Sequence, residues 1–434
     1  MIAALYRAAT RAAGPALSLW LQRRERDGKE DAARLDERRG IAGRPRPEGP
    51  LVWIHAASVG EAMSVLPLVG RLRQHWPAVT ILFTTGTVTS ARLLAERLPP
   101  GCIHQYVPLD VPAWIARFLD HWRPDAVLWV ESEFWPNTIA ELRRRKVPLA
   151  LINARLSPRS FRRWRSLRSL LRPPVDAFKP CLAQDETIAA RLTALGASDV
   201  RCLGNLKFDA EPLPADDGEV ARLRMALGGR PAWLAASVHP GEIDAVAAAH
   251  RRLASTHPGL LTIVAPRHAA RGTEMADALR TAGARVALRS AGTVPAADTD
   301  IYVADTMGEL GVFFRLCRIV FVGGSLIPHG GQNALEPARL GCAIVFGPHM
   351  FNFPEVAAAL VAGGAGEQVA DADALAAAVG RLLSEPATVA ARAAAAQRIA
   401  DSGRGAAERV VEALRPIFEP LREPPAAGMH RARA

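Results

Sequence analysis

Cysteine is scarce in this sequence, and it is absent from the patterns in which it usually stabilises a fold. The five cysteines are odd in number and widely separated, and no two of them form a C-x-x-C pair. Disulfide frameworks use an even number of cysteines, and structural zinc sites use closely spaced ones. We therefore expect reduced thiols in the core of a cytosolic protein.

Long uncharged apolar runs are also missing, even at the N-terminus. Arg7 and Arg11 interrupt an apolar segment there, and the uncharged run 12–22 is about half the length that a spanning helix needs. Leucines and a tryptophan followed by arginines are typical of a segment that lies in the interface of an anionic membrane. We expect residues 1–40 to bind a membrane in this way and to carry no catalytic motif. A secretory signal peptide is the alternative, which the interrupting arginines disfavour.

Acidic charge is in deficit, with a formal net charge of +11 that comes almost entirely from arginine. The stretch 155–172 contains seven arginines and no acid, with Phe161 and Trp164 among them. Such charge requires an anionic partner, but no helix-turn-helix, RNA-recognition or zinc-finger pattern accompanies it. We expect an anionic membrane surface or a phosphorylated lipid and no nucleic acid. A solvated helix face is the alternative interpretation.

The chain is long enough for two domains, and short apolar runs alternate with amphipathic segments from residue 51 onward. This alternation is typical of βα units around parallel sheets. The predicted strands are 51–55, 79–84, 103–107, 126–131 and 148–153 in the first half, and 232–237, 261–265, 301–303, 319–323 and 343–346 in the second.

A segment rich in proline and acid, 208–219, separates the two halves and predicts an interdomain linker. The fold class is α/β, with two Rossmann-like domains facing a cleft at the carboxyl ends of their strands. The expected parts are a membrane-associating segment (1–40), an acceptor-binding domain (41–210), a donor-binding domain (211–422) and a disordered tail (423–434). The alanine-rich segment 371–421 should be helical.

The helix that follows the first predicted strand carries a candidate general base, Glu61. Small residues and a glycine precede it, which places its carboxylate at the carboxyl end of a strand. It could accept a proton from a hydroxyl group if apolar surroundings raise its pKa toward neutrality. The alternative is an acid in the first turn of a helix that only stabilises the helix dipole.

Two further charged residues occupy positions at which a charged side chain is unusual. Glu131 ends a buried apolar strand, which is costly unless the carboxylate is paired or functional, although it could also be a capping residue. Lys207, in a chain with few lysines, lies just before the linker and could reach a phosphate. An ordinary surface lysine is the alternative.

The later strands end in turns suited to an anion. Arg267 offers a planar guanidinium for a phosphate, and the small-residue turn 305–310 offers free backbone amides at a helix start. Two glycine turns in 323–331 precede a helix that has Asn333 and Glu336 on one face, where a glutamate can hold ribose hydroxyls. One glycine turn is weak support, but their ordered recurrence at successive strand ends indicates a nucleotide site.

Two D-x-D pairs, 298–300 and 371–373, could hold a divalent cation. Both lie where an aspartate would cap a turn or a helix, and both lie outside the glycine turns. We expect no metal site, because helix amides, Lys207 and Arg267 can neutralise a leaving phosphate.

Several long motifs together resemble the 3-deoxy-D-manno-octulosonic acid (Kdo) transferase family, from about residue 50 to about residue 360. In chain order they are His-Ala-Ala-Ser-Val-Gly-Glu (55–61), Thr-Thr-Gly-Thr (84–87), Glu-Ser-Glu-Phe-Trp-Pro-Asn (131–137), Asn-Ala-Arg-Leu-Ser (153–157), Gly-Asn-Leu-Lys-Phe-Asp (204–209), Ala-Pro-Arg-His (265–268), Asp-Thr-Met-Gly-Glu-Leu (305–310) and Gly-Gly-Gln-Asn-Ala-Leu-Glu-Pro (330–337).

The resemblance implies the glycosyltransferase-B architecture and an inverting transfer of Kdo from CMP-Kdo to the phosphorylated lipid A precursor. It places the reaction on the cytoplasmic side of the inner membrane of Gram-negative bacteria, with no cofactor. It implies Glu61 as the proton acceptor, with Glu131 and Lys207 stabilising the transition state. The CMP contacts that it implies are Pro266, Arg267, Met307, Gly308, Glu309, Asn333, Ala334, Leu335 and Glu336.

The N-terminal segment departs from the family, since it is richer in alanine and arginine than a strongly hydrophobic anchor. This departure leaves open whether the segment spans the bilayer or lies in its interface. A sugar-nucleotide epimerase of the same architecture is the alternative enzyme, but it has no use for a lipid anchor. A basic, inactive adaptor is the alternative outside enzymes, and the intact motifs disfavour it.

Overall fold

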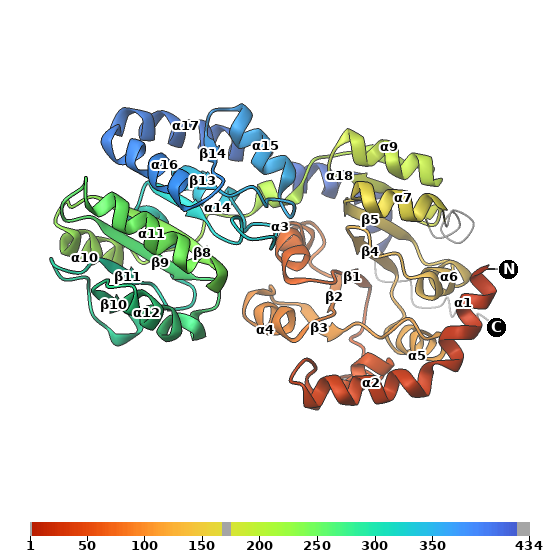
Figure 1. The fold of residues 1–434 in the computed structure, drawn as a ribbon. Coiled ribbons are helices and arrows are strands. Elements are labelled where there is room, and N and C mark those ends of the chain that lie inside the picture. The colour runs from red at the N-terminus through yellow and green to blue at the C-terminus, as the bar shows by residue number, and fades with distance from the viewer. Residues whose placement is uncertain (1, 167–174, 423–434) are drawn as a thin grey trace. The chain divides into compact units, whose positions relative to one another are not determined.

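The computed structural model describes residues 2–166 and 175–422, which form two compact units (Figure 1). The first unit contains the described residues up to Ala210 and those from Gly403 onward, and the second unit is Glu211–Ser402. The predicted tail 423–434 lies outside the described residues, as do 167–174 of the basic stretch.

The first unit is built on a parallel seven-stranded sheet with the order β3-β2-β1-β4-β5-β6-β7. All five strands predicted in this half are present, with ends that differ by about a residue. The strands are β1 (Leu51–His55), β2 (Thr80–Thr85), β3 (Cys102–Tyr106), β4 (Ala126–Val130), β5 (Leu149–Ala154), β6 (Cys181–Ala183) and β7 (Val200–Cys202).

Both faces of this sheet are buried, which explains the continuous apolar runs that predicted it. Every residue of β1 is buried, and alternate side chains enter two different cores. Leu51 and Trp53 pack with α5, α6 and α9, whereas Val52 and Ile54 pack with α3 and α4. The helices are α3 (Val59–His75), α4 (Val88–Arg97), α5 (Pro112–Trp122), α6 (Pro136–Arg144), α7 (Pro158–Ser166) and α9 (Glu186–Leu195), with the short helix η2 (Leu206–Asp209).

The last helix, α18 (Ala406–Phe418), belongs to the first unit, so the predicted domain 211–422 is wrong at its C-terminal end. Its buried stripe enters the same core as α3, and Asp209 of the first unit accepts hydrogen bonds from the Gly405 and Ala407 amides at its start. The sequence period predicts an amphipathic helix, but it does not say which sheet the apolar stripe covers. The short helix η6 (Glu419–Leu421) follows.

The second unit repeats the design with a parallel sheet of order β10-β11-β9-β8-β12-β13-β14. Its strands are β8 (Ala232–Val238), β9 (Leu261–Pro266), β10 (Val286–Leu288), β11 (Ile301–Val303), β12 (Ile319–Val322), β13 (Ala343–Phe346) and β14 (Gly366–Gln368). Its helices are α10 (Asp217–Leu227), α11 (Ile243–Ala254), α12 (Gly272–Thr281), α13 (Leu310–Leu316), α14 (Leu335–Arg339), α15 (Pro354–Ala362), α16 (Ala372–Ser384) and α17 (Pro386–Ser402), with the short helices η3 (Pro240–Glu242), η4 (Ala269–Arg271) and η5 (Arg289–Ala291).

The N-terminal segment forms α1 (Ile2–Ala12), α2 (Gly14–Arg26) and the short helix η1 (Ala32–Arg39). It packs on the first unit through a small core that includes Leu21 and Trp114. Over the described residues, no helix combines the length and the apolar character needed to cross a membrane. All five cysteines are free thiols, as expected, and three of them are buried.

Candidate functional site

Glu61 lies in the first turn of α3, where two donors hold its carboxylate. The Ala57 amide donates to Oε2 at 2.7 Å, and the Ser58 hydroxyl donates to Oε1 at 3.0 Å. In return Ser58 Oγ accepts from the Glu61 amide at 3.3 Å, so Ser58 is the N-cap of α3. Glu61 therefore lies in the first turn of a helix, as the dipole interpretation requires, and the question is whether its carboxylate can also accept a proton.

The environment of Glu61 favours proton acceptance. Burial, and after it the negative charge of Glu131, raises the pKa of Glu61 from 4.5 to about 7, although both hydrogen bonds act in the opposite direction. A carboxylate with a pKa near neutrality is basic enough to take a proton from a hydroxyl group and is still largely ionised at pH 7 or above. Glu61 therefore combines a position in the first turn of a helix with a raised pKa, and its role as a general base stays a prediction.

Glu131 is held at the end of β4 in a backbone conformation that is unusual for its residue type. Its φ is 58°, in the left-handed region, where a residue other than glycine costs about 1 kcal/mol or more. The Glu131 amide still pairs with the Ile152 carbonyl at 3.1 Å, so the sheet imposes the conformation. The side chain is buried, with an exposed fraction of 9% for the residue. Its burial and strain are typical of a residue kept for function.

Lys207 is the positive partner of Glu131, with Nζ 3.6 Å from Oε1. A hydrogen bond holds the Lys207 backbone in place, because Asn205 Oδ1 accepts from the Lys207 amide at 3.0 Å. Asn153, at the end of β5 with a φ of 49°, accepts from the Leu206 amide at 3.0 Å. Sequence reasoning named Asn153 only as part of a motif and missed its role in holding the Lys207 loop.

The amide network continues through Gln184, which follows β6 and was not predicted. Its Nε2 donates to the Asn153 carbonyl at 2.9 Å, and its Oε1 accepts from Asn205 Nδ2 at 3.1 Å. Buried amides that satisfy one another rigidify the backbone around them. The first unit therefore holds a carboxylate with a raised pKa, Glu61, near the ion pair of Glu131 and Lys207.

In the second unit, the predicted phosphate ligand Arg267 follows β9 and is exposed. Within the described part of the chain no acidic side chain pairs with its guanidinium. Pro266, the last residue of β9, is partly buried beside it. Arg267 is therefore available to bind an anion at the carboxyl end of this sheet.

The predicted turn 307–309 is shaped by an ion pair. Arg289 binds the Glu309 carboxylate through two hydrogen bonds of 3.0 and 2.7 Å, and this partner lowers the pKa of Glu309. Gly308 has a φ of +82° with open space beside it, and Met307 is 83% exposed. Because Glu309 already has a partner, we expect this turn to contact a ligand mainly through its backbone.

The predicted segment 333–336 forms the start of α14. Asn333 Nδ2 donates to Glu336 Oε1 at 3.2 Å, which confirms that these two residues share one face. Asn333 Oδ1 accepts from the Leu335 amide at 3.1 Å. The side chains of Ala334 and Leu335 are buried in the core, so only their backbone can meet a ligand.

Sequence reasoning missed Glu242, which organises the glycine turn after β12. Its fully buried carboxylate accepts four backbone hydrogen bonds, from His239 at 3.1 Å, Gly324 at 2.6 Å, and Ser325 and Leu326 at 3.0 Å each. A signal was present, because Glu242 follows β8 through a glycine just as Glu61 follows β1.

Neither D-x-D pair gathers ligands for a metal. Asp300 binds Arg285, and Asp371 accepts from the Asp373 and Ala374 amides as the N-cap of α16. In residues 2–166 and 175–422, no group of three or more His, Cys, Asp or Glu side chains could hold a metal ion. Metal independence of the reaction stays a prediction.

The described part of the basic stretch forms α7, which buries none of its residues fully. Phe161 and Trp164 pack at the edge of the first unit's core, and Arg165 and Arg163 lie over these two rings at 5.8 and 5.3 Å. The aromatic residues therefore have a structural role, and the arginines form an exposed basic face.

Sequence comparisons show that this chain is similar to one family of enzymes. The family model described as 3-deoxy-D-manno-octulosonic-acid transferase (kdotransferase) matches residues 33–210. A curated 3-deoxy-D-manno-octulosonic acid transferase of Haemophilus influenzae is 36% identical over 393 residues, covering 89% of this chain and 92% of the relative.

Solved structures share the fold at low sequence identity. A glycosyltransferase from Rickettsia africae has a TM-score of 0.59 at 10% identity and covers 86% of this chain and 100% of that one. The UDP-GlcNAc 2-epimerase from Neisseria meningitidis has a TM-score of 0.57 at 15% identity, covering 84% and 99%. These similarities concern the fold, in which each of two α/β units contains a parallel sheet. They do not distinguish a transferase from an epimerase.

Proposed function

The chain belongs to the family of 3-deoxy-D-manno-octulosonic acid (Kdo) transferases, and from this premise we propose that it moves Kdo from CMP-Kdo to a phosphorylated lipid A precursor. The observation that carries the proposal is the environment of Glu61, whose pKa is raised to about 7 by burial and by Glu131. An acceptor hydroxyl needs such a base in order to attack a sugar carbon.

In the proposed reaction, Glu61 takes the proton of the acceptor hydroxyl while the hydroxyl oxygen attacks the anomeric carbon of Kdo. The bond between that carbon and the phosphate oxygen of CMP breaks on the opposite face, so the configuration inverts. Positive charge develops on the sugar ring, and the Glu131 carboxylate, paired with Lys207, stabilises it. The electron pair of the broken bond leaves with the phosphate.

The second unit binds the CMP part of the donor in this proposal. Arg267 holds the phosphate, the backbone of turn 307–309 meets the nucleotide, and the paired Asn333 and Glu336 hold the ribose hydroxyls. The mechanism requires the donor held here to reach the acceptor at Glu61. No metal ion or cofactor takes part.

The test is to incubate the purified full chain with CMP-Kdo and a lipid A precursor and to count the added sugars by mass spectrometry. We expect Kdo-containing product that forms only with acceptor and that EDTA does not suppress. Release of CMP with no glycosylated product, or turnover of a nucleotide sugar without acceptor, as an epimerase would give, would reject the proposal. Inhibition by EDTA that magnesium reverses would reject metal independence alone.

We also propose that the protein binds the cytoplasmic surface of the inner membrane through its N-terminal helices. Leu5, Leu19 and Trp20 are 69%, 68% and 44% exposed, and arginines follow them in α2. Apolar side chains beside basic ones are suited to an anionic interface. Removal of residues 1–21 should reduce sedimentation with anionic vesicles, and equal sedimentation at every salt concentration would reject the anchor.

A further inference from the structure

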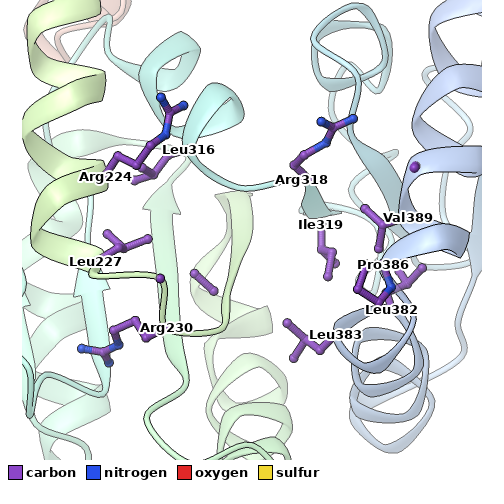
Figure 2. Close-up of a pocket in the computed structure, with 13 residues that line it drawn as sticks. Arg224, Leu227, Arg230, Leu316, Arg318, Ile319, Leu382, Leu383, Pro386 and Val389 are labelled. Atoms are coloured by element: carbon purple, nitrogen blue, oxygen red, sulfur yellow. The ribbon is translucent and has the colours of Figure 1, made fainter.

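The second unit contains a cavity of about 410 Å³ at the edge of its sheet opposite the predicted donor residues. Ala232 begins β8 and lines the cavity. Ile319, which begins β12, also lines it (Figure 2). Arg267 and Asn333, in contrast, follow the carboxyl ends of β9 and β12. The strands are parallel, so the cavity and the donor residues lie at opposite edges of the sheet.

The floor of the cavity is apolar. Helices α10 and α13 contribute Leu227 and Leu316 on one side, and α16 and α17 contribute Leu382, Leu383 and Val389 on the other (Figure 2). Ligand pockets of this chemistry bury chains of methylene groups, and the volume falls within the usual range of about 300 to 1,000 Å³.

The charged residues described in the lining of the cavity are all positive. The described lining residues include three arginines and no carboxylate. Arg230 is occupied, because it donates to backbone carbonyls that include Gly259 at 2.7 Å and Ala296 at 2.9 Å. Arg224 and Arg318 are exposed, and Arg224 donates one hydrogen bond to the Arg315 carbonyl at 3.4 Å. Within residues 2–166 and 175–422 no acidic side chain pairs with either arginine.

We propose that this cavity binds a single-chain anionic lipid, with its chain against the apolar floor and its anionic head against Arg318 and Arg224. The apolar floor cannot stabilise a small ion, and the guanidinium of Arg318 cannot form an ion pair with a neutral chain. An amphiphile that is both apolar and anionic matches both parts. The site is separate from the transfer reaction, so this proposal does not depend on the function proposed above.

A chain-length series tests the apolar half of the proposal. Titration calorimetry of the full chain with hexyl, octyl and decyl phosphate, below their micelle concentrations, should give one saturable site. The dissociation constant should fall by about fourfold for each added methylene until the cavity is filled. Inorganic phosphate should bind far more weakly than octyl phosphate. Equal affinity for inorganic phosphate and octyl phosphate, or no saturable site for any of the alkyl phosphates, would overturn the proposal.

Variants locate the site, since the exposed N-terminal helices could also bind an amphiphile. Arg318→Gln should weaken octyl phosphate by about tenfold and leave 1-octanol unchanged. Leu383→Trp should fill the cavity and remove the binding of both. Arg251→Gln is the control, because Arg251 is exposed on α11 and does not line the cavity. With melting temperatures showing that each variant is folded, binding that survives Arg318→Gln and Leu383→Trp unchanged would overturn the assignment.

Discussion

Glu61 and Glu242 occupy corresponding places in the two units, since each follows the first strand of its unit and reaches back to the backbone before its helix. Glu61 is partly exposed and accepts from one amide and one hydroxyl. Glu242 is fully buried and accepts from four amides. The same local design therefore leaves one carboxylate able to take a proton and uses the other to shape a turn.

The strand ends of the two units differ in the same way. In the first unit, β4 and β5 lead into the non-glycine residues Glu131 and Asn153 with positive φ, and both side chains take part in the site. In the second unit, Ser237 near the end of β8 also has a positive φ, of 56°, but the positive φ values of the predicted turns belong to glycines such as Gly308 and Gly324. In the proposed function the first unit supplies side chains for chemistry, whereas the second binds the donor through backbone amides and through the side chains of Arg267, Asn333 and Glu336.

The strongest test of this contrast is Glu61→Gln. The change is nearly isosteric but removes the base, so turnover should fall by roughly two to four powers of ten while CMP binding is retained. Turnover is measured with CMP-Kdo and lipid A precursor, and CMP affinity by calorimetry. Activity within a few-fold of the parent would contradict the assignment of the base.

The stability of Glu61→Gln provides a control with a defined sign. Because the folded pKa of Glu61 lies near 7, above its usual 4.5, the folded state binds the proton more tightly than the unfolded state does. Stability should therefore fall as pH rises from about 4.5 to 7. The stability of the parent minus that of the variant, measured by melting curves at each pH, should decrease over this range, because the glutamine cannot titrate.

Glu242→Ala should have the largest effect on the stability of the second unit. The variant leaves four buried amides without an acceptor, and the free energy of unfolding should fall by about 3 kcal/mol or more. Donor KM should rise, because the turn after β12 loses its anchor. Glu274→Ala is the control, since Glu274 is an exposed acid of the same unit. A loss no larger than that of the control would refute the anchoring role.

A smaller effect is expected on the pH profile. The acid limb of kcat/KM should have an apparent pKa near 7, because only ionised Glu61 can accept a proton. Glu131→Gln removes the second cause of the raised pKa and leaves burial, so the limb should move to lower pH. The measurement is kcat/KM from pH 5 to 9. A limb that stays in place would show that Glu131 does not act on Glu61.

Sequence reasoning predicted the central strands well because they are long, apolar and buried on both faces. It missed β6, β7, β10 and β14, which have three residues each and are too short to show a period, although it predicted the equally short β11, whose three residues are buried. It placed α18 in the second domain because an amphipathic period does not identify the partner of a helix. It predicted Glu61 as a base from local order along the chain, but it could not give the pKa, which depends on burial and, after it, on Glu131, 70 residues away.

The N-terminal segment is predicted to carry no catalytic motif, and the structure shows that its helix α1 contacts the motif that begins with Glu131. The Tyr6 hydroxyl of α1 donates to Asp110 Oδ2 at 3.1 Å, and Asn137 Nδ2 donates to Thr10 Oγ1 at 2.9 Å. Asp110 also accepts from the Asn137 amide at 3.0 Å, at the end of the motif that begins with Glu131. The contacts that hold α1 and those that hold this loop therefore share Asp110 and Asn137.

The smallest expected effect comes from Tyr6→Phe, which removes one hydrogen bond from this network. Asp110 keeps its bonds to the Asn137 and Thr138 amides, so stability should fall by only about 1 kcal/mol. Tyr302→Phe is a matched control in the second unit, because its hydroxyl donates to the Thr293 carbonyl at 2.8 Å. Both variants should lose similar stability in urea, but only Tyr6→Phe should raise the KM for a detergent-solubilised acceptor, because only Tyr6 is tied to the loop that follows Glu131. If the two variants behave alike in KM as well as in stability, α1 is a structural support of the first unit and does not position the acceptor side.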